Sequence, residues 1–197
     1  MEIKMANKIK SAFAVGIFLI LIPVFTKAQC TSTFDHTTQT GHLAGPAINW
    51  SALVSAQTGT TYTVTSDATL ATALSSLVSG DVILLANGTY SQNWTINASN
   101  VVITAQNSGT WNSRNVTKTN SKITINGSNV VMGGFLYTWP SSPLSNSIVV
   151  NGASVTLCDM DIKNIAYSSG SARCVVQNAT ADNFVFRKNI VDNVNGF

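Results

Sequence analysis

The sequence predicts an all-β protein, a right-handed parallel β-helix of about 4–5 coils that is incomplete and begins with a capping helix. The main observation is an internal repeat. Its copies are residues 96–103 (INASNVVI), 125–132 (INGSNVVM) and 148–157 (IVVNGASVTL), and a fourth begins at residues 174–178 (CVVQN). One strand–turn–strand copy cannot bury its own apolar face, whereas copies stacked about 4.8 Å apart share a core and pair their backbone groups. The second observation is a polar composition dominated by Ser, Thr and Asn, which favours strands and turns over helices.

The spacing of the copies is irregular. Four side chains are taken as equivalent points: Asn97, Asn126, Asn151 and Gln177. They are 29, 25 and 26 residues apart, as expected when loops leave the stack without disturbing it. Residues 106–121 and the segment around residues 139–143 are expected to be such loops. Asparagines at the repeat turns predict turn formation or stacked asparagine ladders.

Two other all-β folds are disfavoured by this repeat. An antiparallel β-sandwich would show hairpin turns without copying its sequence. Propeller blades repeat at about 40 residues or more. The parallel β-helix is therefore the expected architecture.

Residues 1–28 have the pattern of a signal peptide. Three lysines precede an apolar run over residues 11–25, and Ala28 is a small residue suited to cleavage. The apolar run of about 15 residues is shorter than the roughly 20 that span a bilayer. We therefore expect a secreted or periplasmic protein with no membrane contact after the signal is cleaved.

Without this segment the chain has no formal net charge. Residues 1–28 contain four of the eleven basic residues and one of the eight acidic residues, which leaves seven of each sign. A nucleic-acid-binding domain would present a basic patch, so no nucleic-acid partner is expected.

The cysteines lie at positions 30, 158 and 174. In an oxidising compartment Cys158 and Cys174 could form a disulfide. The favoured alternative is two small apolar side chains buried in successive coils. The sequence leaves the disulfide state of all three cysteines open.

The segment before the repeat supplies an arm and a first strand. Residues 29–61 lack periodicity and are expected to form an irregular arm, with the β-helix domain over residues 62–197. Residues 81–85 (DVILL) are predicted to form a strand, and residues 87–88 (NG) a turn after it.

A short amphipathic helix is predicted between the arm and this strand. Ser66 or Asp67 can cap its first turn, and Gly80 can end it. Its apolar face is formed by Leu70, Leu74 and Leu77. Such a helix would cover the open end of the core and shield its strand edge.

Three segments resemble the opening of many secreted pectin-lyase-like β-helix proteins. They are residues 70–74 (LATAL), 80–85 (GDVILL) and 87–90 (NGTY). Within that superfamily the chain most resembles polysaccharide lyase family 6, the chondroitinase B and alginate lyase group, which similarly opens with a capping helix, a GD-x-I-x-L strand and an NGTY-like turn. The resemblance covers about residues 66–197, including residues 125–135 and 186–192 (FRKNIVD). Several enzyme families of the superfamily share these motifs.

This resemblance implies β-elimination of a uronate-containing acidic polysaccharide, alginate or a glycosaminoglycan. In the family a lysine removes the proton α to the uronate carboxyl group, an arginine assists the leaving oxygen, and calcium neutralises the carboxylate. Those residues come from later coils, and no residue of this chain matches their motif. We therefore expect an N-terminal portion of a longer lyase, inactive alone and without assignable catalytic or calcium-binding residues.

Trp139, Arg187 and Lys188 are the candidate substrate-binding residues. Trp139 lies beside Pro140 in a predicted loop, where its ring could stack on a sugar, and the two cations could pair with uronate carboxylates. The favoured alternatives are burial of Trp139 against the coils and ordinary surface charge at Arg187 and Lys188.

Asp159, Asp161 and Lys163 alternate along a predicted strand and should share its outward face. The inward set is Val155, Leu157, Met160 and Ile162. The two aspartates could form an acid–base pair, as in polygalacturonase-like hydrolases, or a cation site. The favoured interpretation is a solvated face with an ion pair worth well under ~1 kcal/mol.

Three classes of function follow from these observations. The leading hypothesis is an exported lyase that acts, as a monomer, on an acidic polysaccharide. The alternatives are a non-catalytic β-helix adhesin or carbohydrate-binding surface protein, and a polygalacturonase-like hydrolase. The sequence does not identify the polysaccharide.

Overall fold

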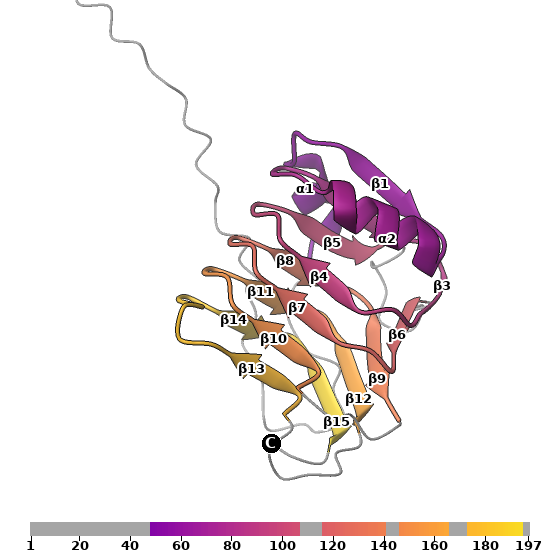
Figure 1. Cartoon of the computed structure of the whole chain (residues 1–197), viewed down its shortest axis with the longest axis vertical. Helices are drawn as coiled ribbons and strands as arrows, with labels where there is room; N and C mark the ends of the chain where they lie inside the picture. The colour runs from indigo at the N-terminus through magenta and orange to yellow at the C-terminus, as the bar shows by residue number, and fades with distance from the viewer. Residues whose placement is uncertain (1–47, 107–115, 141–145, 166–172, 195–197) are drawn as a thin grey trace, which may run out of the picture.

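The computed structural model of the 197-residue chain describes residues 48–106, 116–140, 146–165 and 173–194. Its strands form three sheets that wind around one core as a β-solenoid of about four turns (Figure 1). All pairings between the described strands are parallel. The predicted parallel β-helix is therefore confirmed.

Each sheet collects one strand from successive coils. Sheet A contains β1 (Thr61–Val64), β2 (Val82–Leu85), β5 (Val102–Ala105), β8 (Val131–Gly133), β11 (Thr156–Cys158) and β14 (Val185–Arg187). Sheet B contains β3 (Gly88–Tyr90), β6 (Val116–Thr119), β9 (Leu136–Trp139), β12 (Asp161–Ile165) and β15 (Ile190–Val194). Sheet C contains β4 (Trp94–Ile96), β7 (Ile123–Ile125), β10 (Ile148–Val150) and β13 (Val175–Gln177).

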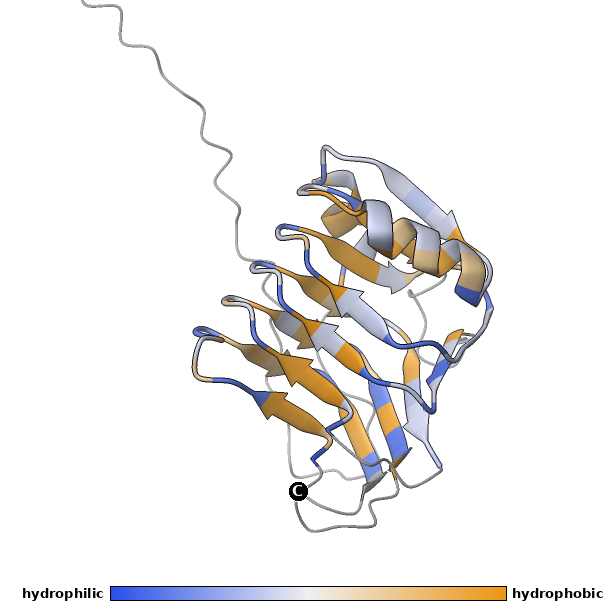
Figure 2. Cartoon of the chain, in the orientation of Figure 1, coloured by the Kyte–Doolittle hydropathy of each residue, from blue (hydrophilic) through white to orange (hydrophobic). Residues whose placement is uncertain are grey.

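Sheet B supplies a third strand to the coils, whereas the repeat predicted two strands and a loop. Of sheet B, only the strand that contains Asp161 and Lys163 was expected. The strand β6 lies inside residues 106–121, which were expected to be a loop, so that expectation was wrong over Val116–Thr119. The strand was not recognised because the strands of sheet B contain Thr, Lys and Asp between their apolar residues, a composition that is also common in loops. Figure 2 shows this contrast, with mostly orange strands in sheet C and mixed colours in sheet B.

The interior is one apolar core that runs through all coils. Side chains at equivalent positions stack in columns, such as Ile103, Met132 and Leu157 in sheet A. Aromatic rings fill the coils nearest the N-terminal end, where Trp94 lies 5.5 Å from Phe135 between ring centroids. The predicted inward residues Val155, Leu157, Met160 and Ile162 all belong to this core.

The predicted capping helix is α2 (Asp67–Ser76), and it covers the N-terminal end of the core (Figure 1). Ser66 is its N-cap, and Ser66 and Thr69 form a reciprocal capping box. Leu70 of the predicted apolar face is fully buried, and Leu74 and Leu77 pack partly buried against the same core. The helix ends at Ser76, before Gly80, because Leu77 already has extended backbone angles.

A second helix, α1 (Trp50–Ser55), lies within residues 29–61, where the sequence predicted an irregular arm. Its Trp50 packs on the outer face of sheet A against Val82, Val102 and Cys158. The indole Nε1 of Trp50 donates a hydrogen bond of 3.1 Å to Asp159 Oδ2. The helix α1 is therefore docked on sheet A through these contacts, since short helices gain their stability from such packing.

The predicted asparagine ladder is present at the turns between sheets C and A. The side-chain amides of four residues are joined in sequence along it: Asn97, Asn126, Asn151 and Asn178. From the sequence, Gln177 was aligned with Asn151, and this alignment was wrong by one residue. Val150 pairs with Gln177, so Asn151 aligns with Asn178.

Cys158 and Cys174 are both buried, and no disulfide joins these two described cysteines. They occupy different environments, since Cys158 lies under Trp50 outside sheet A and Cys174 belongs to the interior core. The favoured alternative of two buried thiols is the one observed. Cys30 lies outside the described residues. Of the helices in the described part of the chain, none is long and apolar enough to cross a membrane.

Candidate functional site

The outward face of sheet B carries Asp161, Lys163 and Asp192 in the last two described coils. In register, Lys163 of β12 lies between Thr138 of β9 and Asp192 of β15. The Nζ atom of Lys163 is 3.0 Å from Asp161 Oδ2, and both side chains are partly exposed to solvent. Such a pair is worth about 0–1 kcal/mol in water. The predicted weak ion pair on a solvated face is therefore the one observed.

Asp159 and Asp161 do not form the acid–base pair that a hydrolase would use. Asp159 has a left-handed backbone conformation with φ of 57°, and its carboxylate accepts the hydrogen bond from Trp50 on the sheet A side. Asp161 faces outward from sheet B and contacts Lys163. The turn between β11 and β12 thus directs the two carboxylates to different partners.

The three predicted substrate-binding residues are not brought together. Trp139 ends β9, is partly buried and packs against the interior core. Arg187 ends β14 with an exposed side chain, and Lys188 follows it in a left-handed turn with φ of 53°. Because Leu136 aligns with Asp161 and Ile190, Trp139 lies at the far end of sheet B from Lys188 and two coils away.

Lys118 is a buried cation that the sequence analysis did not single out. It is fully buried and occupies an inward column of sheet B between Tyr90 and Tyr137. Its Nζ atom donates hydrogen bonds to the backbone oxygen of Gln92, at 2.7 Å, and to Ser121 Oγ. The signal for its burial was the alternation in β6, where Lys118 has the same parity as the buried Val116.

Burial lowers the pKa of Lys118 to about 7, although the carboxylate of Asp67 acts in the opposite direction. The ammonium group also lies 5.2 Å from the centroid of the Trp94 ring, close enough for a cation–π contact. Asp67 itself accepts hydrogen bonds from the backbone N–H and the hydroxyl of Ser91. Burial raises the pKa of Asp67, but the hydrogen bonds from Ser91 and Gln92 outweigh it and leave the pKa below its ordinary value.

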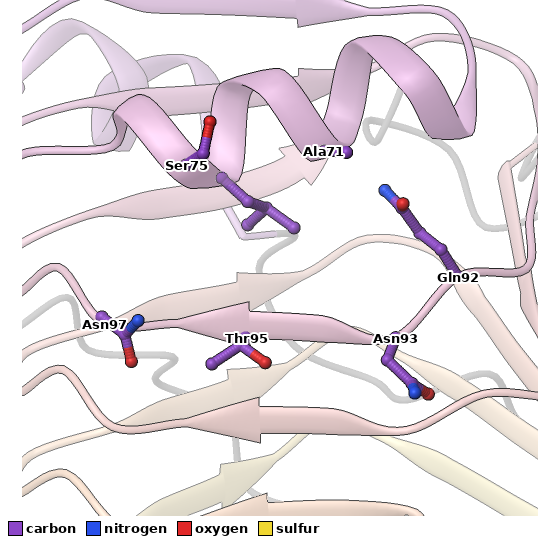
Figure 3. Close-up of a pocket in the computed structure, with 7 residues that line it drawn as sticks. Ala71, Ser75, Gln92, Asn93, Thr95 and Asn97 are labelled. Atoms are coloured by element: carbon purple, nitrogen blue, oxygen red, sulfur yellow. The ribbon is translucent and has the colours of Figure 1, made fainter.

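A shallow groove of about 260 Å³ lies between α2 and β4 (Figure 3), here called the α2–β4 groove. It is lined by Ala71, Leu74 and Ser75 from α2 and by Gln92, Asn93, Thr95 and Asn97 from β4 and its flanks. Asn93, Thr95 and Asn97 are spaced by two residues and therefore project from the same face of the strand. No motif in the sequence predicts this groove.

The described residues do not offer a ready calcium site. No three His, Cys, Asp or Glu side chains converge within the part of the chain that the structure describes. Calcium prefers six to eight oxygen ligands and usually several carboxylates, and the aspartates that contact Trp50 and Lys163 are turned apart.

Comparisons with known proteins agree on the fold and leave the family unassigned. No family model matches the chain, and no curated protein matches it. Among solved structures, a mutant form of the PL6 family alginate lyase AlyGC is similar, with a TM-score of 0.52 and 17% sequence identity over 63% of this chain. Another structure of AlyGC gives a TM-score of 0.44 and 19% identity over 53% of this chain. The chain spans 18% and 15% of the length of these two lyase chains. It therefore shares the parallel β-helix fold of a PL6 family alginate lyase.

Proposed function

We propose that the chain is the N-terminal part of an exported polysaccharide lyase that cleaves a uronate-containing acidic polysaccharide by β-elimination. The observation that carries the proposal is the structural similarity to a PL6 family alginate lyase, at a TM-score of 0.52. Because fold similarity alone does not determine chemistry, the substrate class and the reaction are the parts that need a test.

The described coils supply a framework and part of a binding surface in this proposal. Elimination needs a base for the proton α to the carboxyl group and positive charge to stabilise the developing enolate. Lys163 is engaged with Asp161 and Lys118 is enclosed in the core, so neither is positioned as that base. We assign no catalytic residue to the described part of the chain, and no step to calcium.

Arg187 and Lys188 are proposed to bind the anionic chain. Arg187 is exposed at the end of β14, and a guanidinium group can hold a uronate carboxylate through two parallel hydrogen bonds. Trp139 is a weaker candidate, because part of its ring is committed to the core.

The reaction is tested with the full product of the coding sequence, incubated with alginate and with dermatan sulfate. A lyase produces unsaturated uronate ends, which are followed by their ultraviolet absorbance. New reducing ends without that absorbance would identify a polygalacturonase-like hydrolase instead. Retention on immobilised polysaccharide without any cleavage would identify an adhesin or carbohydrate-binding surface protein.

A variant that cannot fold shows whether the measured lyase activity comes from this protein or from a contaminating enzyme in the preparation. In Gly127→Val, the new Cβ would lie 1.8 Å from the backbone oxygen of Ala98 in the preceding coil, so the coils cannot stack. Any absorbance change that persists with this variant comes from another protein. Export is tested by sequencing the N-terminus of the secreted protein, which is expected to begin at Gln29.

A further inference from the structure

The asparagine ladder runs in one direction along the β-helix. Asn178 donates to Asn151, Asn151 donates to Asn126, and Asn126 donates to Asn97. The two inner amides, of Asn126 and Asn151, thus accept from the following coil through Oδ1 and donate to the preceding coil through Nδ2. Because hydrogen-bonded amides polarise one another, the last donor of such a chain is stronger than an isolated amide.

That last donor is the Nδ2 atom of Asn97, which lines the α2–β4 groove (Figure 3). Its Oδ1 accepts from Asn126 at 2.7 Å, and its Nδ2 has no hydrogen-bond partner among the described residues. Asn93, at the other end of β4, is arranged in the same way. Its Oδ1 accepts from the backbone N–H of Lys122 at 2.8 Å, which leaves its Nδ2 available to another acceptor. The exposed Thr95 lies between them, so one strand presents two amide donors and a hydroxyl.

The opposite wall of the groove is apolar and uncharged. Leu74 of α2 is partly buried and offers an apolar surface, with Ala71 and Ser75 beside it. The Nε2 atom of Gln92 donates to the backbone oxygen of Asp67 at 2.7 Å, which leaves its Oε1 as an acceptor. None of the seven lining residues is charged. This lining suits a sugar ring. The donors and the acceptor can pair with its hydroxyl groups, and the apolar wall can contact its C–H face.

We propose that the α2–β4 groove binds one sugar unit of a glycan chain, through hydrogen bonds from Asn93, Thr95 and Asn97 and apolar contact with Leu74. Its volume of about 260 Å³ is slightly below the range of about 300–1,000 Å³ typical of drug-sized ligands, so it has room for a single ring. Since the lining is uncharged, neutral and uronate sugars bind alike. The groove lies on sheet C and not on sheet B, and the proposal is independent of the elimination reaction.

The outward column of sheet C confines this site to the N-terminal coils. Thr95 aligns with Thr124 in the next coil, and the column continues with Val149 and Val176. Hydroxyl groups are thus presented near α2, and the later coils present methyl groups instead. A glycan bound in the groove would leave the C-terminal part of sheet C uncovered.

The test is a ¹⁵N-resolved NMR titration of the full chain with three probes: a mannuronate tetrasaccharide, cellotetraose and a β-1,4-mannose tetrasaccharide. At least one neutral probe is expected to shift the amide signals of residues 71–75 and 92–97, with a millimolar dissociation constant that does not change with added NaCl. Asn97→Ala and Thr95→Val are each expected to weaken binding about fivefold, the effect of one lost hydrogen bond. The matched control is Thr117→Val, on sheet B and away from both the groove and the ladder, and it should bind as the parent does.

Three results would overturn the proposal. The first is that no probe shifts the signals of residues 92–97. The second is binding of the acidic probe alone with an affinity that falls as salt is added, since a salt-dependent site is a charged one. The third is equal weakening by Thr95→Val and Thr117→Val. None of these results depends on lyase activity, so the groove and the elimination reaction can fail separately.

Discussion

Lys118 occupies an inward position between two tyrosines, where most β-helix coils would place an apolar side chain. The two oxygens that accept from its ammonium group compensate part of the cost of burying a charge. Its lowered pKa shows that the compensation is incomplete. This residue therefore makes the stability of the fold depend on pH.

The first prediction concerns this pH dependence. The pKa of Lys118 is about 7 in the folded chain, against an ordinary value of 10.5, so between these values the unfolded chain binds more protons. The free energy of unfolding should therefore rise from pH 7 towards pH 10.5, by at most about 1.4 kcal/mol per pH unit. Lys118→Met should remove this contribution and stabilise the protein most at and below pH 7. Urea unfolding at a series of pH values measures both effects.

Lys122→Met is the control for that prediction, because Lys122 lies four residues away and is only partly buried. The free energy of unfolding of the Lys122→Met variant should stay within about 0.5 kcal/mol of that of the parent. Loss of stability in Lys118→Met at neutral pH would show that its hydrogen bonds outweigh the cost of burying the charge.

At the level of elements, two helices close different surfaces of the β-helix. The apolar face of α2 covers the open end of the core, and α1 covers the outward apolar residues of sheet A. Both helices are short, so their stability depends on caps and on tertiary contacts more than on helix propensity.

The second prediction concerns the cap of α2. The Oγ atom of Ser66 accepts from the backbone N–H of Thr69, and Thr69 Oγ1 accepts in return from the backbone N–H of Ser66. Ser66→Ala should therefore lower the free energy of unfolding by about 1 kcal/mol. Ser76→Ala, at the other end of the same helix, should be nearly neutral. Denaturation followed by circular dichroism compares the two, and an equal effect of both variants would rule out a specific contribution from the cap.

The third prediction concerns the docking of α1. The hydrogen bond from Trp50 to Asp159 joins the arm to a turn 109 residues later. Trp50→Phe keeps most of the apolar contact and removes the donor, and Asp159→Gly removes the acceptor at a position where glycine readily adopts the left-handed conformation. A double-mutant cycle over these two variants should give a coupling free energy of about 1 kcal/mol. A coupling near zero would mean that apolar packing alone holds α1.

At the scale of the whole molecule, the sequence revealed the stacked coils because the same residues recur at the same turn. The copies around Asn97 and Asn126 are nearly identical, and they align in the structure as expected. The fourth copy was misaligned because Gln177 occupies a position that is apolar in the other copies. Of sheet B, only the strand that contains Asp161 and Lys163 was predicted. The others were missed because polar residues interrupt their short apolar runs, which resembles loop composition when each strand is only three to five residues long.

The candidate sites were harder to predict than the fold, for a physical reason. Trp139, Arg187 and Lys188 were chosen by residue type, and the structure places them at separate points of the stack. The α2–β4 groove exists only because a helix and a strand from different coils lie side by side, and no local motif encodes that arrangement. Nothing in the sequence pattern singled out Lys118, because its burial depends on which face of β6 points inward.

The last prediction concerns the spacing between coils, on which the whole architecture depends. Adjacent coils are separated by the distance between paired strands, about 4.7–4.9 Å, and at the ladder turn this leaves no room for a side chain. A Cβ added at Gly152 would lie 1.9 Å from the backbone oxygen of Gly127. Gly152→Ala should therefore force the two coils apart and lower the free energy of unfolding by about 2–4 kcal/mol. Ala153→Ser, in the same turn, is the control and should change it by less than about 0.5 kcal/mol. Urea unfolding of both variants tests this, and a Gly152→Ala protein as stable as the control would mean that the coils do not stack at this spacing.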